Sequence, residues 1–265
     1  MIHQTVGLVV TGFIIVFIMM FVLWIVHLLI RNAAIVDVGW AAGLGLLAIY
    51  YAYAGPGYSV RKYLIASMAV IWSFRLAAHL LFSRVVGKPE EGRYVQLRKD
   101  WKRNLPVRFL FFFEFQALLD LVLSLPFLLA SLDRRTPIGI CEFVGAAIWL
   151  IGVTGESIAD AQLESFKKNP DNKGKTCRTG LWNYSRHPNY FFEWTIWMGF
   201  AVFCLGSPWG WTGFLSPGLI LFFLLRLTGI PATEAQALRS RGDEYRQYQR
   251  LTSSFIPWFH KKEIA

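Results

Sequence analysis

One segment of this chain places polar and ionisable side chains at the start of an apolar run. It extends from Gly180 to Trp194 and contains His187, Asn189 and Glu193. A charge near hydrocarbon costs roughly 3 kcal/mol or more unless it faces a water-filled cavity, a ligand or a partner. We therefore expect this segment to form a binding site.

A second candidate group lies in an earlier apolar run, where helical spacing places Asp37 and Trp40 on one face. Two interpretations stay open. A carboxylate near a helix N-terminus is an ordinary cap. A carboxyl group held in a low dielectric can instead donate a proton or a hydrogen bond to a substrate carbonyl.

Further polar residues interrupt the next two apolar runs. Trp72, Arg75 and His79 share a face by their spacing of three and four, although an isolated histidine is more often a satisfied core residue than a catalytic one. Gln116 stands among phenylalanines. A buried amide without partners costs on the order of 1 to 3 kcal/mol, so we expect Gln116 to contact a neighbouring helix or a ligand.

The elements that position these residues must be membrane helices. The 265 residues are 55% hydrophobic and 16% aromatic, with a mean hydropathy of +0.41, which is typical of polytopic membrane proteins. We predict an all-α, single-domain protein with seven transmembrane helices, the first being a retained helix rather than a signal peptide. The predicted spans are Gly7–Ile30, Ala33–Tyr53, Tyr63–Phe82, Phe109–Ala130, Ile138–Gly155, Tyr190–Leu205 and Gly213–Ile230.

The basic residues predict the orientation. Most Lys and Arg residues lie in three polar stretches, 83–108, 156–188 and 231–265, which the positive-inside rule places on the cytoplasmic side. The N-terminus is then outside and the C-terminus cytoplasmic. Topology and anionic lipids explain part of the net charge of +10, and an anion site could use the rest. Nucleic-acid binding is not supported, because no recognition motif is visible.

Three further features of the sequence are its cysteines, a cationic turn and the C-terminal tail. The cysteines, Cys141, Cys177 and Cys204, are too far apart to indicate a disulfide framework or a metal site. A cationic turn from 172 to 180 could clamp phosphates with side chains, since it matches neither a Walker nor a Rossmann glycine pattern. The tail predicts an amphipathic helix that is broken at Gly242 and covers the site or lies at the membrane surface.

The polar motif and its flanks together resemble the C-terminal half of the steroid 5-alpha-reductase superfamily. The residues that carry the resemblance are Gly180–Tyr190 with Glu193, preceded by Asp160 and Lys167 and followed by Gly242, Tyr245, Tyr248 and Pro257. The pattern is most similar to the bacterial branch, formerly of unknown function. It extends to sterol C14 reductases and, more loosely, to isoprenylcysteine carboxyl methyltransferases.

The resemblance implies a membrane reductase that binds NADPH in its cytoplasmic half and reduces a carbon–carbon double bond conjugated to a ketone. We also expect a monomer without a metal site. Residues 1–130 would serve the substrate and residues 131–265 the cofactor. The matching cofactor residues are Asp160, Lys167, Asn189 and Glu193. Less direct matches, or neighbours of the motif, are Arg84, Arg93, Tyr94, Lys175, Arg178, Trp182, Tyr184, His187, Tyr190, Glu234 and Tyr248.

The N-terminal half departs from the superfamily. Val36-Asp37 stands where the superfamily has a Gln-Glu pair, and Trp72 stands where it has its catalytic Tyr. We expect Asp37, aided by Trp40, Trp72 or Gln116, to hydrogen-bond the ketone oxygen of a 3-oxo-4-ene steroid or sterol-like lipid. A bacterial inner membrane is favoured over the endoplasmic reticulum.

Two other functions stay open. The same C-terminal half could bind S-adenosylmethionine and methylate a lipid or prenyl-thiol, or the protein could bind lipid without catalysis. The many cations favour NADPH, because a pyrophosphate and a 2′-phosphate need several positive charges and a sulfonium does not.

Overall fold

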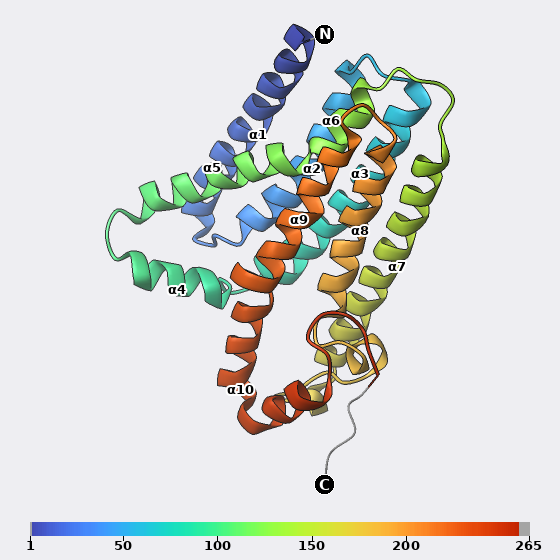
Figure 1. Cartoon of the computed structure of the whole chain (residues 1–265). Helices are drawn as coiled ribbons and strands as arrows, with labels where there is room; N and C mark the ends of the chain where they lie inside the picture. Colours follow the sequence, from blue (N-terminus) through green and yellow to red (C-terminus); the bar gives the residue numbers. More distant parts are fainter. Residues whose placement is uncertain (1, 260–265) are drawn as a thin grey trace. The chain divides into compact units, whose positions relative to one another are not determined.

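The computed structural model describes residues 2–259, and the regular structure within them is helical (Figure 1). Six of the helices or helix pairs in this part of the chain are long and apolar enough to cross a membrane, as expected of a polytopic all-α protein. The principal helices are α1 (Ile2–Ile30), α2 (Ile35–Ala54), α3 (Ser59–Leu80), α4 (Gly92–Trp101), α5 (Leu105–Leu123), α6 (Leu125–Leu132), α7 (Ile140–Lys168), α8 (Pro188–Leu205), α9 (Leu215–Phe222) and α10 (Ile230–Leu251). The short segments between or beside them are η1 (Leu81–Val85), η2 (Pro170–Asn172), η3 (Gly180–Asn183), η4 (Gly210–Phe214) and η5 (Phe223–Leu227).

The predicted span at Tyr190–Leu205 forms a helix, α8, but α8 is not among the six candidate membrane spans. It has only 18 residues, and its first two turns carry Asn189 and Glu193, which lower its apolar character. A seventh span and the orientation therefore stay predictions. Beyond the predicted span end at Gly155, α7 continues as a polar helical extension to Lys168.

Within the described residues, the chain forms two compact units. Unit 1 consists of residues up to 143 together with 201–216, and it contains α1 to α6 and η4. Unit 2 consists of residues 144–200 and those from 217 onward, and it contains most of α7 and α8 and all of α10.

Glycines allow α2 to lie close to its neighbours in unit 1. A Cβ atom at Gly39 would lie 2.4 Å from Leu23 Cδ1 on α1, and one at Gly43 would lie 2.3 Å from Asp120 Oδ2 on α5. Small residues spaced by four are a common device for close helix contact in membranes. Asp120 is fully buried against Gly43, and nothing in the sequence pattern distinguished it.

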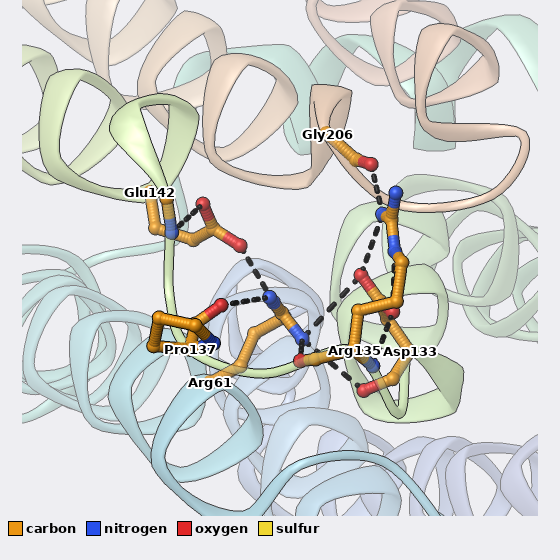
Figure 2. Close-up of polar contacts among 7 residues, drawn as sticks. Arg61, Asp133, Arg135, Pro137, Glu142 and Gly206 are labelled. Atoms are coloured by element: carbon orange, nitrogen blue, oxygen red, sulfur yellow. Dashed lines mark hydrogen bonds and ion pairs between the residues drawn. The ribbon is translucent and has the colours of Figure 1, made fainter.

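A buried ionic cluster joins three segments of unit 1, and Figure 2 shows it. Arg61, at the start of α3, contacts Glu142 Oε1 through its Nε at 2.6 Å and Asp133 Oδ2 through its Nη1 at 3.4 Å. It also donates hydrogen bonds to the carbonyls of Arg135, at 2.6 Å, and Pro137, at 3.3 Å. We call Arg61, Asp133, Arg135 and Glu142 the Arg61 cluster. No sequence pattern assigned a role to these four residues.

Asp133 is held in this cluster as a carboxylate. Burial by itself raises the pKa of Asp133, but hydrogen bonds from Arg135 and the charge of Arg61 outweigh burial and hold the pKa below its ordinary value. Arg135 Nε and Nη2 lie 3.0 Å and 2.9 Å from the two Asp133 oxygens, and Arg135 also donates to the Gly206 carbonyl. The cluster therefore ties the 133–139 segment to the starts of α3 and α7.

In unit 2, glycines bring α7 and α8 together. A Cβ at Gly155 would lie 2.3 Å from the Phe192 ring, and one at Gly199 would lie 2.6 Å from the Trp149 backbone. The tail helix α10 changes direction at Gly242, whose φ of 55° and ψ of −124° lie outside the helical region (Figure 1). The predicted break at Gly242 is confirmed, because glycine adopts this backbone conformation without a Cβ clash.

Candidate functional site

One face of α7 in unit 2 carries a line of polar residues. Glu156, Asp160 and Lys167 are spaced by four and seven, with the apolar Leu163 between the last two, so they share one face of the helix. Asp160 and Lys167 lie two turns, or about 10 Å, apart along the axis. Glu156 is only 4% exposed, and the sequence analysis did not assign it a role. The α7 face therefore extends from a buried acid to a cation.

Asn189, in the first turn of α8, contacts this face of α7. Its Nδ2 donates a hydrogen bond to Asp160 Oδ1 at 3.3 Å. Its Oδ1 is buried and has no hydrogen-bond partner among the described residues. An unsatisfied buried acceptor costs about 1 to 3 kcal/mol, so it marks a position where a ligand's donor would be stabilised.

Glu193 follows Asn189 by one helical turn and is 9% exposed. Its Oε1 accepts a hydrogen bond from Trp197 Nε1 at 2.9 Å, and Trp197 is fully buried. The structure thus brings Asp160 and Asn189 into contact and places Glu193 one turn further along α8, as the motif spacing predicts. Trp197 was missed, because a tryptophan one turn from an acid carries no distinctive signal in an aromatic-rich helix.

A small pocket with several cations opens at the end of α7. It has a volume of about 180 Å³, and its lining includes Lys167 and Lys175, both expected at the cofactor site. Lys173 and Arg241 also line it, and neither was assigned before. Lys173 lies in the cationic turn that the sequence revealed, whereas Arg241 comes from α10 and could be placed only by the fold. We call this feature the cationic pocket.

Arg178, expected to bind phosphate, has protein partners instead. Its Nη2 donates to the Glu244 carbonyl at 2.7 Å and lies 3.3 Å from Glu244 Oε1, while its guanidinium stands 5.4 Å from the Tyr248 ring centroid. Glu244 also accepts hydrogen bonds from the backbone and hydroxyl of Thr176. Arg178 therefore holds the cationic turn against α10.

His187 and Glu234, also expected at the cofactor, meet in a buried network. Glu234 Oε1 is 2.6 Å from Arg186 Nε and 3.4 Å from His187 Nε2, and its Oε2 accepts from Gln249 at 2.8 Å. Burial lowers the pKa of His187 below its ordinary value, although Glu234 opposes that shift. The network fixes α10 relative to the 185–188 segment within unit 2.

The aromatic residues of the motif divide into buried and accessible ones. Tyr248 is 1% exposed and donates to the carbonyls of Trp182 and Ser185, the latter at 3.2 Å. Trp182 donates through Nε1 to the Ala159 carbonyl at 2.9 Å. Tyr190 stacks on the His187 ring with centroids 5.3 Å apart. Tyr184 is 41% exposed and is the most accessible aromatic residue of the motif.

In unit 1, Asp37 is surrounded by donors. Its Oδ1 accepts from the Tyr94 hydroxyl at 2.7 Å, and its Oδ2 accepts from Arg84 Nη1 at 3.3 Å and also from Arg93 Nη2. This arrangement suits a carboxylate that accepts hydrogen bonds rather than an acid that donates one. The sequence could not show that η1 brings one of these donors, Arg84, to Asp37 and that α4 brings the other two. A catalytic role for Asp37 stays a prediction.

The sequence predicts contact with the cofactor for Arg84, Arg93 and Tyr94. In the structure, all three donate hydrogen bonds to Asp37. Burial and the neighbouring Asp37 charge raise the pKa of Tyr94 well above its ordinary value. Desolvation lowers the pKa of Arg93, but the Asp37 charge outweighs it and leaves the pKa raised. Tyr94 is therefore a neutral donor and Arg93 a cation over the ordinary pH range.

The other residues expected to be catalytic lie in the same unit. The rings of Trp40 and Trp72 meet edge to face with centroids 6.3 Å apart, on α2 and α3. Gln116 is half-buried on α5. A catalytic role for each of these residues stays a prediction.

Comparison with known proteins identifies relatives for most of this chain. Residues 23–252 match the family described as "Protein of unknown function (DUF1295)". An uncharacterized protein of Schizosaccharomyces pombe is 27% identical over 94% of this chain and 79% of its own length. No solved structure matches.

Two relatives with printed activities match shorter parts. The 3-oxo-5-alpha-steroid 4-dehydrogenase 1 of Rattus norvegicus is 26% identical over 44% of this chain and 42% of its own length. A probable O-methyltransferase of Ustilaginoidea virens is 40% identical over 67 residues, which are 25% of this chain and 23% of its own length. The chain thus spans less than half the length of both of these proteins.

Proposed function

Because this chain belongs to the family described as "Protein of unknown function (DUF1295)", within the steroid 5-alpha-reductase superfamily, we propose that it is an NADPH-dependent membrane reductase. Its substrate would be a 3-oxo-4-ene steroid or a similar lipid with a ketone conjugated to a carbon–carbon double bond. The proposal includes a monomer with seven spans, an outer N-terminus and a cytoplasmic C-terminus in a bacterial inner membrane.

The buried acceptor on Asn189 supports this proposal most directly. Asn189 Oδ1 lacks a partner among the described residues, while Asp160 fixes the other end of the amide. Lys167 lies two turns beyond Asp160 on the same face of α7, and it lines the cationic pocket. A ligand with a hydrogen-bond donor at one end and phosphates at the other fits that order, and a dinucleotide is such a ligand.

The residues that would hold the cofactor follow from this order. Asn189 and Glu193 would bind the nicotinamide and its ribose, Tyr184 would pack on an accessible ring or sugar face, and Lys167 and Lys175 would bind phosphate. Bound NADPH would supply the hydride, which is chemistry that the side chains of this protein cannot provide. His187, Glu234 and Tyr248 would position these groups through the network around Arg186.

Asp37 and the residues that donate hydrogen bonds to it would bind the ketone of the substrate. Among the groups that touch Asp37, Tyr94 is the uncharged donor, and in this structure its one hydroxyl proton goes to Asp37. We assign the hydrogen bond to the ketone oxygen to Tyr94, whose hydroxyl would turn its proton from Asp37 to the ketone when the substrate binds, while Arg84 and Arg93 keep donating to Asp37. One well-placed donor to a developing enolate is worth roughly 3 to 4 kcal/mol. Trp40, Trp72 and Gln116 would line the substrate region.

The test uses purified full-length protein with NADPH and progesterone or a similar 3-keto-4-ene. We expect NADPH absorbance to fall only when both are present, and a reduced lipid to appear by mass spectrometry. Glu193→Ala should weaken NADPH binding, and Tyr94→Phe should lower turnover with little change in NADPH affinity. Unchanged NADPH affinity in Glu193→Ala would remove Glu193 from the cofactor site.

A methyltransferase is the second candidate, and the short match to a probable O-methyltransferase favours it. In that case the α7–α8 face would bind S-adenosylmethionine, whose sulfonium has no need of the cationic pocket. Equilibrium binding separates the two functions. S-adenosylmethionine bound without NADPH would support the methyltransferase, and neither ligand bound would support a lipid-binding protein without catalysis.

A further inference from the structure

The cationic pocket of unit 2 gathers positive charge from three segments that are separate in sequence. Lys167 comes from the end of α7, Lys173 and Lys175 from the turn after η2, and Arg241 from α10. The described residues that line the pocket include no carboxylate. Four cations around about 180 Å³ repel one another, so an anion between them would be stabilised.

Three acids near the pocket contact residues outside it, and Asp171, two residues before Lys173, is not among the lining residues. Glu164 pairs with Lys168 at 2.8 Å, and Asp243 pairs with Arg246 at 2.6 Å. Glu244 accepts from Arg178 and from Thr176, as described above. The protein therefore neutralises cations on both sides of the pocket while leaving acids out of the pocket itself.

The shape of the pocket limits the size of the anion. Leu163 and Phe166 of α7 supply apolar wall, and the cations stand around it. Gly174, between the two lysines, has a φ of 80°, and a Cβ there would meet nothing within 4 Å. The turn thus exposes its backbone beside the two ammonium groups, and the space has room for a phosphate group.

The several cations of the pocket favour a phosphate monoester over a phosphate that carries a single negative charge. A phosphate monoester carries about −1.5 to −2 charges at pH 7, and therefore gains more from several cations than a group with a single negative charge. Each phosphate of a dinucleotide's pyrophosphate carries one charge, whereas the 2′-phosphate of NADPH is a monoester. Arg178 is held by Glu244, which leaves the recognition to Lys173, Lys175 and Arg241 with Lys167.

We propose that the cationic pocket binds a phosphate monoester and so selects ligands that carry one. Where that monoester is the 2′-phosphate of NADPH, the inference rests on the proposed function, and the pocket is what distinguishes NADPH from NADH. The same chemistry would also accept a monoester headgroup, as in phosphatidic acid.

The experiment measures equilibrium binding to the full-length protein, in detergent and in nanodiscs. The variant is the triple substitution Lys173→Gln, Lys175→Gln and Arg241→Gln. Its control is Lys168→Gln with Arg246→Gln, which removes exposed cations outside the pocket, one at the end of α7 and one on α10. The ligands are NADP⁺, NAD⁺, 2′-AMP, adenosine, and nanodiscs with or without phosphatidic acid.

The proposal expects the triple variant to bind NADP⁺ and 2′-AMP roughly tenfold or more weakly, since each lost charge-assisted contact is worth about a factor of ten. NAD⁺ and adenosine binding should change less than about twofold, and the control variant should match the wild type. Unchanged affinity of the triple variant for NADP⁺, 2′-AMP and phosphatidic acid overturns the proposal.

The two proposals fail separately in this design. If the wild type binds no dinucleotide but binds phosphatidic acid, and the triple variant loses that binding, the proposed function fails and the pocket stands. If the wild type binds NADP⁺ and NAD⁺ and the triple variant changes neither, the pocket proposal fails and the cofactor proposal stands. A wild type that binds none of the monoesters overturns the pocket proposal directly.

Discussion

Arg61 in unit 1 lies between two buried carboxylates, whereas Lys173 and Arg241 in unit 2 line a pocket that no carboxylate enters among the described residues. Arg61 is 3% exposed, and Asp133 and Glu142 are at least as buried. The pocket lysines are exposed. Both regions are basic in sequence. The Arg61 cluster contains the carboxylates that neutralise its cations, whereas no carboxylate is among the described residues that line the pocket.

This difference separates a structural role from a binding role. A buried cation is tolerated only with compensating charges and hydrogen bonds, so every donor in the Arg61 cluster serves the fold. Exposed cations cost little when uncompensated, because water solvates them until a ligand arrives. We therefore expect changes in the Arg61 cluster to act on stability and changes in unit 2 to act on ligand binding.

The largest expected effect is that of Arg61→Ala. It would leave Asp133 and Glu142 buried without their shared cation, and breaking a buried pair costs about 3 to 5 kcal/mol. The melting temperature of the purified protein should fall sharply. Arg134→Ala, at an exposed neighbour, should leave it nearly unchanged. Equal melting temperatures for the two variants would show that the cluster does not stabilise the fold.

Asn189→Ala comes second, and it should act on binding. Losing an amide that contacts the ligand costs about 1 to 1.5 kcal/mol, so NADPH affinity should fall roughly tenfold. Asn169→Ala provides a matched control, because Asn169 is exposed and only caps a short turn at Asp171. Affinity that is the same in both variants would remove Asn189 from the cofactor site.

Acid should act on the Arg61 cluster through Asp133. Its pKa is lower in the folded protein than in the unfolded chain, so Asp133 contributes stability above the unfolded pKa of about 3.9, and that stability is lost as pH falls toward the folded pKa. Melting temperatures measured between neutral pH and pH about 3 should fall less steeply for Asp133→Asn than for the wild type. Parallel curves would contradict this account.

The smallest effect belongs to the cationic pocket. Without ligand, the triple glutamine variant should keep its melting temperature or gain slightly. Lys173 and Lys175 are exposed, where substitutions change stability by about 0.5 kcal/mol or less, and the contact that half-buried Arg241 loses with the Tyr245 ring is offset because like charges are removed. Any gain should vanish in high salt. A large loss of stability would place these cations with Arg61 as structural residues.

Much of the site could be read from the sequence, because its core is contiguous. Asn189 and Glu193 stand one turn apart, and the family resemblance added Asp160, which the structure brings into contact with Asn189. The break at Gly242 followed from glycine alone. These features depend on local spacing, which a sequence displays directly.

Other features depend on contacts between distant segments. Arg61 and Glu142 are 81 positions apart, Tyr94 reaches Asp37 across 57, and Asp120 meets Gly43 through helix packing. No periodicity links such residues, so the sequence showed neither the donors around Asp37 nor the carboxylates around Arg61. Arg241 joined the pocket for the same reason, through the fold of α10.

The central claim is that this protein transfers a hydride from NADPH to a conjugated lipid. The most direct test incubates the full-length protein with NADPH deuterated at the transferred position and a 3-oxo-4-ene steroid, with labelled S-adenosylmethionine also present. The account predicts a reduced steroid that carries deuterium at the carbon β to the ketone. A methylated product with no deuterium in any lipid would contradict it.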